Sequence, residues 1–236
     1  MKITKIIIAT VLIISFYSCN KKEEIIDTLS NNEAKELIES SLQKNTSGFD
    51  AEIEEIAKES TENYAVNSDC NIQYQDNFER HYAETVVTAN YTVNWTYQMN
   101  CNNLNIPQSI NFLISSNGNY HTQNIVSQDS TESSMDVFGL QPSADSLTFS
   151  GYFKRVGTQE LNAVNTRNVS STVEIMFTDI TVNKETYLID SGNATIVLTG
   201  TTTDNQTFNF TANLVFNGQR TATLTINNET YTIDLN

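Results

Sequence analysis

The sequence predicts a mainly β protein: an antiparallel meander that forms a β-sandwich or a rolled, barrel-like domain, preceded by two short N-terminal helices. The first observation is that every odd position from Val87 to Cys101 is apolar and every even one polar. Side chains alternate faces along a strand, so this segment has one dry and one wet face. The same alternation recurs in residues 208–216 and 222–235. Turn dipeptides rather than crossover helices separate these segments, which argues against an α/β enzyme fold.

The chain divides into four segments. They are a lipoprotein signal peptide at 1–18, a flexible charged tether at 19–30, a helical neck at 31–64 and an antiparallel β domain at 65–236. Lys2 and Lys5 lie before an apolar run that ends near residue 14. A basic start followed by an apolar run of this length is typical of a secretory signal, because the run is too short to span a bilayer stably.

Cys19 follows Ser18 directly at the end of the apolar run. This pattern resembles a bacterial lipobox, with Phe16 in place of the usual Leu. The resemblance implies diacylation of the Cys19 thiol, cleavage before Cys19 and acylation of the new N-terminus. Several acyl chains on one residue would hold the protein on a membrane stably. The alternative is an ordinary secretory signal with an incidental cysteine.

Residues 20–24 form a short charged tract with two adjacent acids. The tract resembles the surface-export signal of Bacteroidetes lipoproteins. It implies an outer-membrane lipid anchor on the cell surface, with the periplasmic face as the alternative.

Two helices are expected in the neck. Ser30 and Glu33 fit a capping box, and apolar residues then recur at helical spacing as far as Leu42. Gly48 is available for the left-handed stop of this helix, and Asp50 can cap the next one. Both helices are short and need a surface to pack on. We expect an antiparallel pair against one end of the β domain, with a partner-binding face as the alternative.

A disulfide is expected between Cys70 and Cys101, the two cysteines that remain once Cys19 is lipidated. Closing a loop of about 30 residues would stabilise the fold by roughly 3–4 kcal/mol in the chain-entropy model. There is no Cys-x-x-Cys, and His81 and His121 are isolated in the sequence. We therefore predict no metal site and no cofactor.

Turn dipeptides divide the β domain into about ten to twelve strands. These predicted turns are Asn117-Gly118, Asn183-Lys184, Ser191-Gly192, Asn217-Gly218 and Asn227-Asn228. So many short strands are expected to form a sandwich or to roll up rather than stay one flat sheet. Thr and Asn on the wet faces argue against a membrane barrel, whose outward residues form an apolar band.

The composition excludes some partners and offers few catalytic candidates. The chain has 13 Lys and Arg against 28 Asp and Glu, a net charge of −15, which repels nucleic acid. No nucleophile, phosphate-loop or zinc-protease motif occurs, so no catalytic residue is predicted. Aromatic residues outside the cleanest apolar faces are the better candidates, because exposed rings stack on sugars. They are Tyr74, Tyr82, Tyr120 and Tyr152. The alternative is that these are ordinary sheet aromatics.

Three Asp-Ser/Thr-x triplets resemble the short O-glycosylation motif of exported Bacteroidetes proteins. The resemblance implies modification at Thr28, Ser130 and Ser146.

The whole chain resembles a group of Bacteroidetes (flavobacterial) surface lipoproteins. The resemblance rests on Ser18-Cys19, the helical neck, residues 95–107 and the terminal meander from Gly200 to Leu235. It implies a location and an architecture, but no activity.

Three functions follow as hypotheses. The first is non-enzymatic binding of a glycan or an envelope protein by a lipid-anchored domain. The second is an exported hydrolase with a carboxylate pair in a cleft. The third is a lipocalin-like carrier of a small hydrophobic ligand inside a closed barrel, which requires an interior that side chains do not fill.

Overall fold

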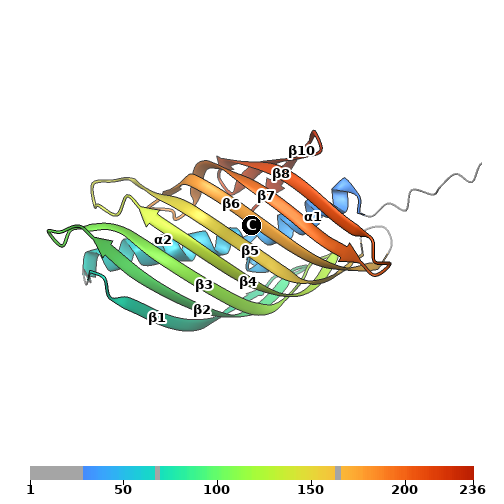
Figure 1. The fold of residues 1–236 in the computed structure, drawn as a ribbon, viewed down its shortest axis with the longest axis horizontal. Helices are drawn as coiled ribbons and strands as arrows, with labels where there is room; N and C mark the ends of the chain where they lie inside the picture. Colours follow the sequence, from blue (N-terminus) through green and yellow to red (C-terminus); the bar gives the residue numbers. More distant parts are fainter. Residues whose placement is uncertain (1–28, 67–69, 163–165) are drawn as a thin grey trace, which may run out of the picture.

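The structure is a computed structural model that describes residues 29–66, 70–162 and 166–236, with side chains 63–66 left out (Figure 1). The predictions for residues 1–28, including the signal peptide, Cys19 and Thr28, lie outside the described residues. The described elements are α1 (Asn31–Leu42), the short helix η1 (Lys44–Thr46), α2 (Phe49–Val66), β1 (Gln73–Ala83), β2 (Thr88–Cys101), β3 (Pro107–His121), β4 (Ile125–Phe138), β5 (Ser146–Leu161), β6 (Arg167–Asn183), β7 (Ile189–Thr202), β8 (Thr207–Gly218), β9 (Thr221–Ile226) and β10 (Glu229–Asp234).

The ten described strands form one antiparallel sheet in chain order, each strand paired with the next. This confirms the predicted mainly β meander with two helices before it. The sheet does not close into a barrel. Figure 1 shows long oblique strands with α1 and α2 behind them, so the helices cover one face of the sheet. We call the helix-covered face the inner face and the opposite one the outer face.

One hydrophobic core holds the helices and the sheet together. Strand β2 shows how the sheet contributes, because Ala89, Tyr91, Val93 and Trp95 are buried while the intervening residues are more exposed. Apolar residues of α1 and α2, such as Leu37 and Ile53, belong to the same cluster of buried side chains. The helical segment is therefore a layer along the inner face, not a pair packed on one end of the sheet as expected from the sequence.

The start of α1 agrees with the sequence prediction, whereas the predicted roles of Gly48 and Asp50 between α1 and α2 do not. Ser30 and Glu33 form the capping box expected at the start of α1. The left-handed residue after η1 is Ser47, with φ 58°, instead of Gly48. Gly48 is needed for space, because a Cβ there would lie 2.6 Å from the carbonyl oxygen of Gln43. Asp50 does not cap α2; it lies inside the first turn and pairs with Arg220.

The helical layer connects regions near both edges of the open sheet. On the β1 side, Arg80 forms an ion pair with Glu55 of α2. On the other side, the Lys44 N–H donates to the carbonyl oxygen of Leu235, just after β10, over 2.8 Å. Arg220, in the turn between β8 and β9, binds α2 through Asp50. The helices therefore occupy the interior that an unclosed sheet would leave open.

Two predicted turns are confirmed. Asn183 ends β6, and its side chain accepts hydrogen bonds from the N–H groups of Glu185 and Thr186. Asn227 and Asn228 connect β9 to β10 with φ angles of 48° and 67°. These left-handed conformations are the ones that a two-residue type I′ hairpin requires.

The other predicted turns are corrected. The hairpin expected at Asn217-Gly218 turns two residues later, at Gln219 and Arg220, whose φ angles are 51° and 56°. Asn117-Gly118 and Ser191-Gly192 lie inside strands β3 and β7. At Gly192 a Cβ would lie 2.8 Å from the Cα of Ile180, so this glycine allows a close approach of two strands.

The predicted disulfide is present. Cys70 and Cys101 are joined by an S–S bond of 2.05 Å with their Cα atoms 5.6 Å apart. The bond links the chain just before β1 to the last residue of β2.

Candidate functional site

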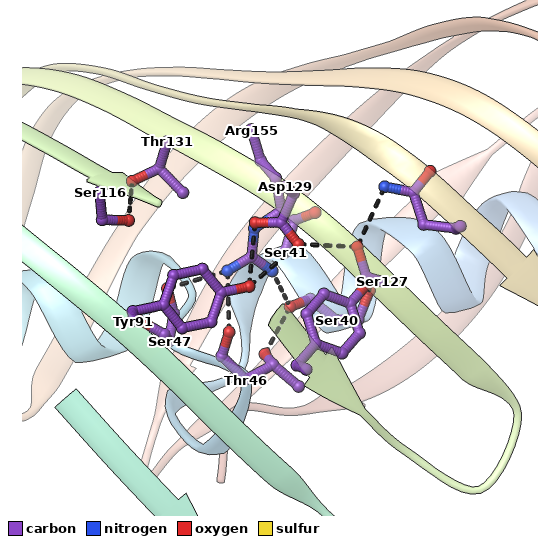
Figure 2. Close-up of polar contacts among 12 residues, drawn as sticks. Ser40, Ser41, Thr46, Ser47, Tyr91, Ser116, Ser127, Asp129, Thr131 and Arg155 are labelled. Carbon is purple, nitrogen blue, oxygen red and sulfur yellow. Dashed lines mark hydrogen bonds and ion pairs between the residues drawn. The ribbon is translucent and has the colours of Figure 1, made fainter. Parts of the chain in front are cut away.

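A buried polar cluster joins the helical layer to the inner face of the sheet (Figure 2). Its centre is Arg155 of β5, which is only 2% exposed. The guanidinium donates to the carbonyl oxygens of Ser40 at 2.7 Å, Thr46 at 2.8 Å and Ser47 at 2.9 Å. These carbonyls belong to the end of α1 and to the loop around η1, where helices leave acceptors unsatisfied. Arg155 thus binds the end of one helix and the turn into the next.

Asp129 of β4 balances the charge of Arg155. Its Oδ1 lies 3.3 Å from the Arg155 Nε. It also accepts from the Tyr91 hydroxyl at 2.9 Å and from the Ser127 hydroxyl at 2.7 Å. Burial opposes the charge of Arg155, but Asp129 together with Tyr91, Tyr120 and Glu52 outweighs burial, so the pKa of the guanidinium is raised. Burial also raises the pKa of Tyr91, which keeps its hydroxyl protonated as a donor.

Two glycines make room for this cluster. Gly118 of β3 is opposite Tyr91 on one side and Asp129 on the other, and a Cβ at Gly118 would lie 2.6 Å from the Tyr91 ring. Gly157 of β5 is the other neighbour of Asp129, and a Cβ there would lie 2.4 Å from the Asp129 Cβ. Glycine at 118 therefore allows close packing between neighbouring strands within β3, which explains why Asn117-Gly118 is not a turn.

The alternation of apolar and polar residues does not predict strand β4, and the polar cluster explains why. Inward positions of β4 carry Ser127, Asp129, Thr131 and Ser133 rather than apolar residues, so the usual alternation is hidden. Thr131 and Ser133 donate to the carboxylate of Glu52 in α2, at 3.2 and 2.6 Å. These polar side chains are buried because the helices supply their partners.

The cluster is a structural joint, because its charged groups already have protein partners. Two buried carboxylates of α2 also have protein partners: Asp50 pairs with Arg220, and Glu52 accepts from the hydroxyl of Ser133. Among the residues that the structure describes, no group of three or more His, Cys, Asp or Glu side chains is placed to hold a metal ion.

Asp50 makes stability depend on pH. Burial, opposed by Arg220 and supported by Glu54, raises its pKa from 3.8 to about 6. Between these values the folded protein holds a proton that the unfolded chain has released. The stabilisation from protonated Asp50 is thus present below pH 4 and lost as the pH rises to 6, a change of about 3 kcal/mol.

The matched comparison is Asp50→Asn, which cannot titrate. Relative to wild type, the free energy of unfolding of this variant should increase by about 2 kcal/mol between pH 4 and pH 7 in urea titrations. A constant difference between the two proteins over this range would contradict the raised pKa.

One accessible candidate site is a hollow on the outer face of β6, β7 and β8, with a volume of about 750 Å³. We call it the outer hollow. Its outward side chains form two rows across the strands, Met176–Thr195–Asn213 and Thr178–Asn193–Val215. Met176 and Val215 are 47% and 44% exposed. The hollow therefore combines apolar contact surface with amides and hydroxyls that can donate and accept hydrogen bonds.

Tyr152 extends the first row of the outer hollow. It is the β5 partner of Met176 in the sheet register and is 41% exposed. The adjacent Gly151 lines the hollow, at an irregularity in the pairing of β5 and β6. Of the four tyrosines predicted from the sequence, Tyr152 is the one that the structure places beside this hollow.

The other three tyrosines lie elsewhere. Tyr74 stacks on Tyr97 with their ring centroids 5.2 Å apart, and Tyr82 packs partly buried against the core. Tyr120 is buried, with its hydroxyl 2.8 Å from that of Ser40 and its ring beside Arg155. The expectation that Tyr120 offers an exposed ring is therefore wrong. The alternation of side chains along β3 places Tyr120 on the inner face, which the helices cover.

The sequence itself contains a signal for the outer hollow. Met176 and Val215 occupy positions where the alternation of β6 and β8 predicts polar, outward residues. The two described O-glycosylation candidates, Ser130 and Ser146, are partly exposed residues of β4 and β5 and lie outside this hollow.

Comparisons of the chain with models of known protein families, with curated proteins and with solved structures found no match. No helix in the described part of the chain combines the length and the apolar character needed to cross a membrane.

Proposed function

We propose that this protein is a lipid-anchored envelope protein of the cell surface that binds a glycan at the outer hollow, without catalysing a reaction. The observation that carries the proposal is the composition of the hollow. Apolar side chains alternate with Thr and Asn across neighbouring strands, and an exposed tyrosine stands beside them. A sugar ring has the matching chemistry, with apolar C–H faces and hydroxyls at its edge.

The same geometry favours glycan binding over the two other hypotheses. A carrier needs free space on the inner face, where Phe49 of α2 instead packs on Phe153 and Phe177 at centroid distances of 6.0 and 5.0 Å. A hydrolase needs free carboxylates in a cleft, whereas Asp50 and Asp129 are held by arginines. Glycan binding at the outer hollow leaves the packing of Phe49 and the ion pairs of Asp50 and Asp129 unchanged.

Binding is tested first by thermal unfolding of the chain from Asn20 onward with a panel of glycans. A ligand at 100 times its dissociation constant should stabilise the folded protein by about 2.7 kcal/mol. A glycan that raises the melting temperature is then titrated against variants of the outer hollow. If no glycan shifts the melting temperature, the proposal fails and an envelope protein becomes the preferred partner.

Two substitutions in the hollow should weaken the binding of that glycan. Tyr152→Ala removes a stacking surface, and Asn213→Ala removes hydrogen-bonding groups. We expect each to raise the dissociation constant about 2- to 10-fold in calorimetric titrations. Leu113→Ala and Asn94→Ala are the matched controls, since both residues are exposed on the outer face away from the hollow. Equal effects of the controls would place the binding site elsewhere.

The anchor is tested separately at Cys19, because only its thiol can carry the diacylglycerol of a lipoprotein. Cys19→Ser should move the protein from the membrane fraction to the soluble fraction of cells. A protein that stays membrane-bound without the acylated cysteine would contradict the anchor, and it would leave the glycan site untouched.

A further inference from the structure

The outer hollow has a direction, because the residues that line it follow the register of the sheet. Its floor is the backbone of four residues that are paired from strand to strand, Gly151–Phe177–Ala194–Leu214. The side chains of Phe177, Ala194 and Leu214 are buried toward the inner face, so they leave this floor open. The two outward rows described above lie on either side of the floor. The hollow therefore runs across the strands from β5 to β8, which lie side by side in Figure 1.

The hollow is longer than one sugar ring. Neighbouring strands are about 4.8 Å apart, so the three steps from Tyr152 in β5 to Asn213 in β8 cover about 14 Å. In an extended chain of pyranoses, each sugar advances the chain by a distance close to one strand spacing. A ligand that contacts both Tyr152 and Asn213 is thus a chain of about four sugars that lies across the strands.

The hollow also carries no charge. Among the described residues that line it, none is Asp, Glu, Lys, Arg or His. Lys154, the next outward residue of β5 after Tyr152, already pairs with both Glu132 and Glu174. A glycan with carboxylate or sulfate groups would lose part of its hydration in the hollow and find no cation there in return. The chain as a whole, with 28 acids against 13 bases, would repel such a glycan further.

We propose that the ligand of the outer hollow is a linear, uncharged glycan that lies across β5 to β8, with about four of its sugars in contact with the protein. This inference rests on the proposed glycan binding and specifies the class of the glycan and its direction. At one end the Tyr152 ring packs on the apolar face of a sugar, and at the other end the Asn213 amide bonds to hydroxyls. Between them Thr195 and Asn193, both in β7, contact the glycan from opposite sides.

The first test measures binding as a function of glycan length. Linear oligomers of glucose, mannose and galactose with one to eight sugars are titrated calorimetrically into the chain from Asn20 onward. For the series that binds, we expect the dissociation constant to fall about 10-fold or more between two and four sugars and to change less than about 2-fold beyond five. Oligomers of the matching uronic acids are the charged controls and should bind at least about 10-fold more weakly.

The outcomes of this test separate the inference from glycan binding itself. A monosaccharide that binds as tightly as the tetramer would overturn the linear ligand, and a uronic acid oligomer that binds as tightly as its uncharged counterpart would overturn the uncharged one. Either result would leave a glycan site in place. If no oligomer of either kind binds, both the inference and the proposed function fail.

The second test measures the direction of the glycan. For the tetramer that binds, Tyr152→Ala and Asn213→Ala should each raise the dissociation constant about 2- to 10-fold, although these residues lie three strands apart. Thr211→Ala is the matched control and should have little effect, because Thr211 is the neighbouring exposed residue of β8 and lies outside the hollow. A glycan that ran along β8 would contact Thr211 and Asn213 but not Tyr152. A large effect of Thr211→Ala together with no effect of Tyr152→Ala would therefore refute the direction across the strands.

Discussion

Replacing Arg155 with Met should lower the free energy of unfolding by about 3–5 kcal/mol, because the change leaves the carboxylate of Asp129 buried without its partner cation. The three carbonyls of Ser40, Thr46 and Ser47 lose their donor at the same time. Urea unfolding followed by circular dichroism measures the loss. We expect the helical layer and the sheet to unfold in one transition, because one core contains both.

Lys154→Met is the control for this experiment. Lys154 precedes Arg155 in β5 but lies on the outer face, 3.5 Å from both Glu132 and Glu174. The substitution removes the same charge at a solvated position, where ion pairs contribute little to stability. If Arg155→Met costs no more than Lys154→Met, the polar cluster does not hold the helices on the sheet. Combining Arg155→Met with Asp129→Asn should recover part of the loss, since no buried carboxylate then remains.

Phe49→Ala should cost a similar 3–5 kcal/mol, by removing a large side chain from the centre of the core. Phe49 begins α2, is fully buried and contacts Phe153, Phe177 and Phe216 of three different strands. The cavity would lie between the helical layer and the sheet, and neither the helices nor the strands can move easily to fill it. Urea unfolding at pH 7 provides the measurement.

The control for Phe49→Ala is Leu113→Ala, which shortens an apolar side chain that is 50% exposed on the outer face. Surface changes of this kind usually stay within about 0.5 kcal/mol. A small effect of Phe49→Ala would mean that the helices are a separate neck, as the sequence first suggested, and not part of the core.

The alternation of apolar and polar residues was sufficient to predict the β meander, because side-chain direction along a strand is a local property. It located β2 and the last three strands. The capping box at Ser30 and the disulfide between Cys70 and Cys101 were predicted for the same reason: each depends on residue types whose chemistry has few alternatives.

The positions of turns were harder to predict, since a glycine has more than one use. Asn227-Asn228 makes a turn, whereas Gly118 lies within a strand to accommodate Tyr91 and Asp129 from its neighbours. A dipeptide pattern does not distinguish these cases, because the side chains that need the space come from other strands. Strand β4 was missed for a related reason: its inward serines, Thr131 and Asp129 are buried only because α2, Tyr91 and Arg155 bond to them.

The sequence by itself determined the fold class, the antiparallel order of neighbouring strands, the first helix start and the disulfide, all of which follow from local patterns or from a few residues of distinctive chemistry. Only the tertiary structure decided where the helices pack, which tyrosines are exposed, and that Met176, Asn193 and Asn213 meet on one surface. Those properties depend on the register between strands and on the curvature of the whole sheet. Both are set by contacts between residues far apart in the chain, which a local pattern does not contain.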